Sequence, residues 1–164
     1  MGKQFSKQTI RGVNLRGRTV LVRADYNVPL TKKGTISDDL RIRASLPTLK
    51  YLLEQNCKIV IMSHLGRPKG WDMKLSLEVV AKHLAELLGR KVQFIGDCVG
   101  DEVRQAVRRA PLGSVILLEN LRFYPEEEAD VASLPPPPRW RPANSRPTRA
   151  PTAYSPTTLR QCDF

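Results

Sequence analysis

Residues 58–70 read Lys-Ile-Val-Ile-Met-Ser-His-Leu-Gly-Arg-Pro-Lys-Gly, and the rest of the chain is arranged around them. The run 58–62 is short, rich in β-branched residues and not alternating, which is typical of a strand buried on both faces of a parallel sheet. At Ser63 the apolar run stops, and a histidine, an arginine, a lysine and two glycines follow. Open α/β sheets bind ligands outside the carboxyl ends of their strands, so an anion site is expected here. A solvated basic turn is the alternative.

Three further strands and three helices are predicted around this segment. The strands cover Arg18–Arg23, Lys91–Ile95 and Ser114–Leu118, and the helices cover about Asp39–Gln55, Leu77–Leu88 and Val99–Ala110. Alternation of strands and helices at this spacing predicts an α/β fold, with a doubly wound, Rossmann-like parallel sheet carrying helices on both faces.

Helix boundaries are predicted from capping residues. Ser37 and Asp38 are N-cap candidates for the first helix and Ser76 for the second, which Gly89 ends. Pro47 predicts a break or a new first turn inside the first helix.

Composition divides the chain into residues 1–130 and residues 131–164. The second part contains four consecutive prolines, Pro135–Pro138, and continues with Arg, Pro, Thr, Ser and Ala without an apolar period. Such a segment cannot bury enough surface to order itself. We therefore expect a domain over 1–130 followed by a Pro/Arg-rich disordered tail.

Charge and composition narrow the function classes. The net charge of +11 suggests a nucleic-acid binder, but five arginines against one aspartate fall in residues 131–164, and acids and bases alternate before them. No apolar run approaches the roughly 18 residues of a membrane span. The N-terminus lacks an apolar signal segment. Three cysteines without metal-ligand spacing indicate a reduced, cytoplasmic protein. We expect no nucleic-acid or membrane partner.

Polar side chains follow three of the predicted strands. They are Asp25 and Asn27 after the first, His64 and Arg67 after the second, and Asn120 and Arg122 after the fourth, with Arg41 near the start of the first helix. In a parallel sheet these strand ends lie along one edge. The guanidinium fork suits phosphate and carboxylate, so the set predicts a pocket for a small polyanion. It describes neither a metal site nor a nucleophile with its base.

Each of these residues also has a structural interpretation. Asp25 could orient neighbouring backbone, Asn27 could serve a turn, His64 could be a structural histidine, and Arg122 could pair with Glu126–Glu128. His83 lies among charged residues of a helix and is expected at the surface. Neither GxGxxG nor the Walker-type GxxxxGK[ST] occurs.

Five motifs resemble those of the phosphoglycerate kinase family, in its order and spacing. They are Arg23-Ala24-Asp25-Tyr26-Asn27-Val28-Pro29, Arg41-Ile42, Ser63-His64-Leu65-Gly66-Arg67-Pro68, Asp97-Cys98-Val99-Gly100, and Leu117–Phe123 followed by three glutamates. The resemblance covers residues 1 to about 130. It implies the amino-terminal, phosphoglycerate-binding half of a two-domain, hinge-closing glycolytic kinase. That enzyme transfers a phosphoryl group between 1,3-bisphosphoglycerate and Mg-ADP.

The resemblance also implies roles for single residues. Asp25 and Asn27 would bond the hydroxyl and carboxylate region of 3-phosphoglycerate, and His64, Arg67 and Arg122 would hold its phosphate. Arg41 would be the catalytic residue, nearest the transferring group. The family uses Mg-ATP and Mg-ADP, for which this chain has no matching site. We therefore expect a monomer that binds substrate but has no turnover by itself.

After about Asp130 the chain departs from the family pattern. Codons allowed for Ala143–Arg146 and Pro156–Leu159 can encode Gln-Leu-Ala-Ala and Asn-Asp-Ala in a neighbouring frame, and both strings suit the family at those places. The tail is thus interpreted as a candidate out-of-frame segment. Two other functions stay open at this point, a non-catalytic small-polyanion-binding module and a basic nucleic-acid-binding protein that uses the tail.

Overall fold

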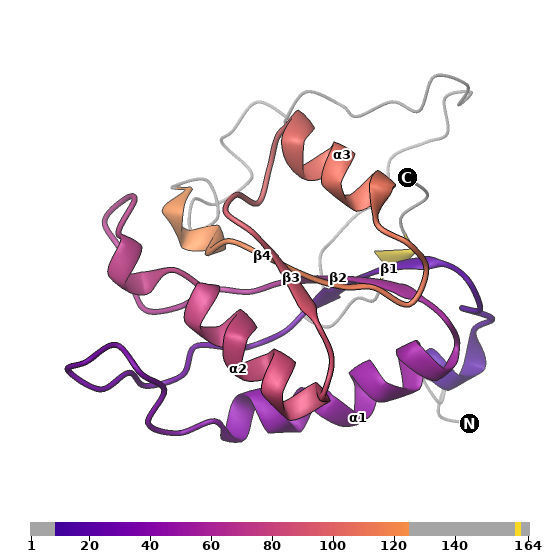
Figure 1. Ribbon diagram of the computed structural model, residues 1–164, viewed down its shortest axis with the longest axis horizontal. Helices are drawn as coiled ribbons and strands as arrows, with labels where there is room; N and C mark the ends of the chain where they lie inside the picture. Colours follow the sequence, from indigo (N-terminus) through magenta and orange to yellow (C-terminus); the bar gives the residue numbers. More distant parts are fainter. Residues whose placement is uncertain (1–8, 125–159, 162–164) are drawn as a thin grey trace, which may run out of the picture.

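The computed structural model describes residues 9–124 and 160–161, and Figure 1 shows these as one sheet with helices above and below it. The strands are β1 (Thr19–Arg23), β2 (Lys58–Met62), β3 (Val92–Ile95), β4 (Val115–Leu118) and β5 (Arg160–Gln161). The α-helices are α1 (Leu40–Glu54), α2 (Glu78–Leu88) and α3 (Asp101–Arg109), with three 3₁₀ helices, η1 (Ile10–Gly12), η2 (Met73–Leu75) and η3 (Leu121–Phe123).

The strand order is β3-β4-β2-β1-β5, and β1 to β4 run parallel. Val60 in the middle of β2 pairs with Leu21 of β1 on one side and with Ile116 of β4 on the other. The two residues of β5 pair antiparallel with Val20 and Leu21 at the outer edge of β1. The predicted α/β fold with a parallel sheet is confirmed. Except for β5, the predicted tail lies outside the described residues.

Two apolar layers hold the helices on opposite faces of the sheet (Figure 1). Ile59 and Ile61 of β2 pack into the layer that α1 and α2 close. Val60, between them, faces the layer that α3 closes through Val103 and Val107. Because successive strand side chains point to opposite faces, β2 is buried on both sides, as its unbroken apolar run predicts.

The predicted break at Pro47 is wrong, because α1 is continuous from Leu40 to Glu54 with Pro47 inside it. Pro47 lies on the exposed side of the helix. On the opposite side Ile42, Leu49 and Leu52 are fully buried. Tertiary packing of this apolar face therefore holds the helix together across the missing N–H of proline.

The predicted N-caps are wrong, because Asp39 and Leu77 occupy the N-cap positions of α1 and α2, whereas the predicted end of α2 at Gly89 is confirmed. Asp38 and Ser76 still bind backbone N–H groups at the two helix starts. The Oδ1 of Asp38 accepts the Leu40 N–H at 2.9 Å, and the Ser76 hydroxyl accepts the Glu78 N–H at 3.2 Å. Gly89 ends α2 in the left-handed conformation, with φ of 64°.

The expectation that His83 lies at the surface is only partly met, because the side chain is half-buried. Its side chain is only 29% exposed, and its Nε2 lies 2.7 Å from Oδ2 of Asp39. This contact joins the middle of α2 to the residue that precedes α1. The helices described here include none that is both long and apolar enough to cross a membrane.

Candidate functional site

The loops that follow β1, β2 and β4 meet at the backbone N–H and carbonyl of Gly66. The Gly66 N–H donates to Oδ1 of Asn27 at 2.9 Å, and its carbonyl accepts from Nη1 of Arg122 at 2.7 Å. Asn27 follows β1, Gly66 follows β2 and Arg122 follows β4, so three distant segments are joined at one point. The structure thus brings together side chains that the sequence predicted at this sheet edge.

Glycine is the residue type that fits position 66 without strain. Its φ is +64°, and a Cβ there would lie 2.9 Å from Cδ2 of Leu75. A side chain would therefore be strained in the backbone and would also press on Leu75.

The hydrogen bond from Gly66 fixes which way the Asn27 amide points. A backbone N–H needs an acceptor, so the side-chain oxygen of Asn27 faces Gly66. The NH₂ group of Asn27 is consequently turned away from Gly66. A group held in this way is oriented to donate to an oxygen of a ligand.

Asp25 and Arg41 form an ion pair at the same edge of the sheet. Oδ1 of Asp25 also accepts the Asn27 N–H at 3.1 Å, so the carboxylate orients neighbouring backbone as its structural interpretation predicts. Partial burial acts to raise the pKa of Asp25, but the hydrogen bonds from Arg41 and Asn27 and the charges of Arg41 and His64 hold it below its usual value. Asp25 therefore stays ionised and keeps Arg41 beside the site.

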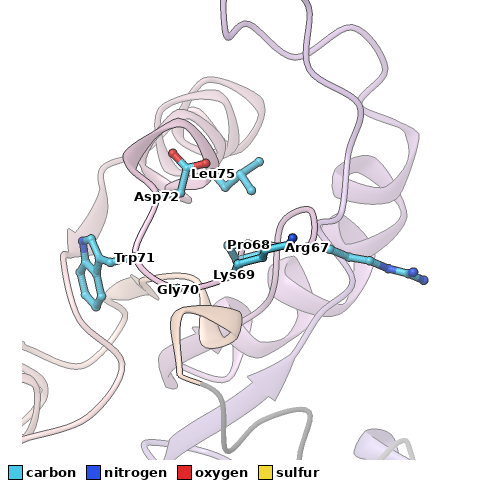
Figure 2. Close-up of a pocket in the computed structure, with 7 residues that line it drawn as sticks. All are labelled: Arg67, Pro68, Lys69, Gly70, Trp71, Asp72 and Leu75. Atoms are coloured by element: carbon cyan, nitrogen blue, oxygen red, sulfur yellow. The ribbon is translucent and has the colours of Figure 1, made fainter.

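His64 and Arg67 lie on the loop after β2. His64 is half-buried and close enough to Asp25 for its charge to act on that carboxylate. Arg67 is exposed on the rim of a hollow of about 530 Å³. Figure 2 shows Arg67 and Trp71 extending to opposite sides of this hollow, with Asp72 and Leu75 along a third side.

Asn120 supports the site from the interior of the protein, where its side chain is fully buried. Its Nδ2 donates to the carbonyls of Leu65 and Leu75 at 2.8 and 2.9 Å, and its Oδ1 accepts the N–H of Leu65 at 3.2 Å and of Arg122 at 3.1 Å. Every hydrogen bond described for the Asn120 amide is made with a backbone group. Asn120 thus shapes the loops that carry His64, Arg67 and Arg122.

Glu119 is a buried carboxylate that the sequence reasoning missed. It is 2% exposed, and it accepts the Leu77 N–H at 2.9 Å, the Asn120 N–H at 2.7 Å and the Ser76 hydroxyl at 2.8 Å. Its position is therefore that of a cap on the start of α2. A glutamate placed directly after an all-apolar strand was the available signal, because a carboxylate at a buried strand end needs several donors.

Taken together, the arrangement suits an anion. Three arginines, Arg41, Arg67 and Arg122, come together with His64 from the loops and the first turn of α1, and the Asn27 amide adds a neutral donor. No group of three or more His, Cys, Asp or Glu side chains within the described residues could hold a metal ion. The pairing of Arg122 with Glu126–Glu128 lies outside the described residues.

Comparison with known proteins agrees with this geometry. The sequence profile of the family described as phosphoglycerate kinase matches residues 10–136, which is most of the chain. The chain belongs to the phosphoglycerate kinase family. The match includes all six predicted substrate residues.

Curated phosphoglycerate kinases from distant organisms are similar to this chain. The enzyme of Aquifex aeolicus is 55% identical over 121 residues, which cover 74% of this chain and 30% of that protein. The wheat protein named cytosolic phosphoglycerate kinase is 51% identical over 128 residues, covering 78% of this chain and 32% of that protein. The chain thus spans about a third of the length of the curated relatives it matches.

Solved structures of the family share the fold. The crystal structure of phosphoglycerate kinase from Pyrococcus horikoshii superposes with a TM-score of 0.69 at 38% identity, over 75% of this chain and 30% of that one. The structure of phosphoglycerate kinase from Coxiella burnetii gives a TM-score of 0.61 at 36% identity, over 71% of this chain and 28% of that one. The parallel sheet and its helices are therefore those of part of a phosphoglycerate kinase.

Proposed function

We propose that this chain carries the 3-phosphoglycerate-binding part of a phosphoglycerate kinase, the glycolytic phosphotransferase that moves a phosphoryl group between 1,3-bisphosphoglycerate and Mg-ADP. The observation that carries the proposal is the meeting of three strand-end loops at the Gly66 backbone, which fixes Asn27 and Arg122 relative to each other. Family membership supplies the choice of substrate among small polyanions.

We propose that two groups of side chains bind different parts of the substrate. His64, Arg67 and Arg122 bind the substrate phosphate, since arginine donates two hydrogen bonds in the plane that a phosphate offers. Asn27 and Asp25 bond the hydroxyl and carboxylate region. The Asn27 NH₂ group, turned away from Gly66, is the donor in that interaction.

Arg41 is the proposed catalytic residue. Its guanidinium is held by Asp25 and is half-exposed, so it can reach a ligand beside the pair. Phosphoryl transfer requires little covalent chemistry from the protein and depends on positioning and on stabilising charge. A fixed cation next to the transferring group supplies that stabilisation.

We propose that the described residues serve the acid substrate and that Mg-ADP is not bound by them, since the loops of the site present arginine side chains suited to a phosphate and a carboxylate. We expect the purified 164-residue chain to form no ATP from Mg-ADP and 1,3-bisphosphoglycerate.

We further propose that the chain acts as a cytoplasmic monomer on a small-molecule substrate. The wheat relative carries the word cytosolic in its name, which supports the location. If the chain bound nucleic acid instead, its affinity for nucleic acid would fall steeply with salt concentration and would not change on addition of 3-phosphoglycerate.

Calorimetric titration of the 164-residue chain with 3-phosphoglycerate tests the proposal. We expect saturable binding, and we expect Arg67→Ala to weaken it by about 10- to 150-fold, the range for one charge-assisted hydrogen bond of about 1.5–3 kcal/mol. Arg67 is exposed, so its removal leaves the fold intact.

The matched control is Arg90→Ala, which removes the same charge from an exposed position ahead of β3, at the opposite edge of the sheet. This variant should bind like the parent chain. Equal weakening by both variants would mean that only the net charge of the chain affects binding. Failure of the parent chain to bind 3-phosphoglycerate would refute the proposed function.

A further inference from the structure

Trp71 is a large aromatic residue at the surface of the protein. It lies on the loop between β2 and α2, and 54% of its surface is exposed. Burial of the exposed part of such a side chain by neighbouring rings is favourable. No role for Trp71 was predicted from the sequence.

The contacts of Trp71 lead away from its own loop. Its ring centroid lies 4.7 Å from that of Phe123 and 6.2 Å from that of Tyr124, in tilted and edge-on arrangements. Both are favourable geometries for aromatic pairs. Phe123 is 5% exposed and follows Arg122 directly, so Trp71 covers the residue next to a site arginine.

Tyr124 extends this link to a third loop. Its hydroxyl donates to Oδ1 of Asp97 at 2.7 Å, and Asp97 follows β3. Trp71, Phe123, Tyr124 and Asp97 therefore connect the loops after β2, β4 and β3. We call this set the aromatic bridge.

The geometry points to Trp71 as a positioning residue that holds the loop of Arg67 against the loop of Arg122, so that both arginines can engage one anion. The inference rests on the proposed 3-phosphoglycerate site. In Figure 2 the Trp71 side chain extends from the loop on the side opposite to Arg67, so it acts through the loop backbone and does not contact the ligand itself.

Two hydrogen bonds connect the loop after β2 to the loop after β4. The Leu121 N–H donates to the Ser63 carbonyl at 3.1 Å, and Arg122 reaches the Gly66 carbonyl. Both run between the β2 and β4 loops, as the Trp71–Phe123 stack does. Removal of the stack should loosen these bonds while the sheet below them stays intact.

The test measures amide hydrogen exchange and 3-phosphoglycerate affinity in the 164-residue chain carrying Trp71→Ala. We expect faster exchange at the Gly66 and Leu121 amides, unchanged exchange at Ile61 in β2, and affinity about three- to tenfold weaker, the range for one aromatic pair. Trp71→Phe should restore both quantities. Met73→Ala, which removes another exposed apolar side chain from the same connection, should change neither.

The outcomes separate this inference from the proposed function. Exchange at Gly66 and Leu121 that stays as in the parent chain overturns the positioning role, and so does a uniform acceleration that includes Ile61, because that is a loss of global stability. A parent chain that does not bind 3-phosphoglycerate refutes the proposed function, while the exchange data still decide whether Trp71 holds the two loops.

Discussion

Replacement of Gly66 by alanine is the most informative single change at the site. At φ of +64° an alanine pays about 1–2 kcal/mol for the left-handed conformation. Its Cβ would lie 2.9 Å from Cδ2 and 3.0 Å from Cδ1 of Leu75. These atoms are the end of a flexible, partly exposed side chain, so rotation relieves part of that clash. We expect a total loss of about 2 kcal/mol in the free energy of unfolding, measured by urea denaturation.

The same substitution should also weaken substrate binding. A shift of the Gly66 backbone disturbs the 2.9 Å bond to Asn27 and the 2.7 Å bond from Arg122 together. Misplacement of two ligand-binding groups should weaken 3-phosphoglycerate binding by about 10- to 30-fold, or about 1.4–2 kcal/mol. Calorimetry of the folded variant measures this loss.

Gly34→Ala is the matched control, because Gly34 has a similar φ of +76° and open space around its Cα. It lies in the loop before α1 and makes no contact with Gly66 among the described hydrogen bonds. The control should lose similar stability and keep the parent affinity. Unchanged affinity in Gly66→Ala, or an equal loss in both variants, would contradict the positioning role of the Gly66 backbone.

Three other predictions concern groups around the site. Asn120→Ala leaves buried backbone groups of Leu65 and Leu75 without partners. We expect it to lower the free energy of unfolding by about 3 kcal/mol or more, measured by urea denaturation. A decrease of less than about 1 kcal/mol would show that water replaces the amide. Burial, with the nearby carboxylates, raises the pKa of the Cys98 thiol to about 12, so iodoacetamide at pH 8 should label it about a thousandfold more slowly in the folded chain than in urea, as peptide mass spectrometry would report. Burial acts to raise the pKa of Asp97, but hydrogen bonds from Tyr124 and from backbone N–H groups hold it low, so its stabilisation is present above about pH 4 and is lost as pH falls through the folded pKa. Tyr124→Phe should therefore destabilise most at neutral pH and progressively less in acid, and a pH-independent difference would refute this assignment.

The elements that sequence reasoning predicted well are those set by local pattern. β2 was predicted with both its ends, since a short run rich in β-branched residues and bounded by polar residues favours a strand buried on two faces. The carboxyl ends of parallel strands share one edge of the sheet, which is why the loops of Asn27, Gly66 and Arg122 meet there.

The features that sequence reasoning missed depend on contacts between distant segments. Pro47 stays inside α1 because the opposite face of the helix is packed, which no local rule reports. Glu119 bonds to Ser76 and Leu77, 43 and 42 residues away in the chain. His83 meets Asp39 across 44 residues. Burial of a polar side chain is decided by such partners, and its own sequence neighbours do not reveal them.

An amide-resolved NMR titration of the 164-residue chain with 3-phosphoglycerate tests the central claim most directly. The account predicts saturable shifts at Asn27, His64, Gly66, Arg67 and Arg122, with the amides of α3 on the far face unchanged. A well-dispersed spectrum in which these signals do not move at saturating ligand would contradict it, because the fold would then be present without the site.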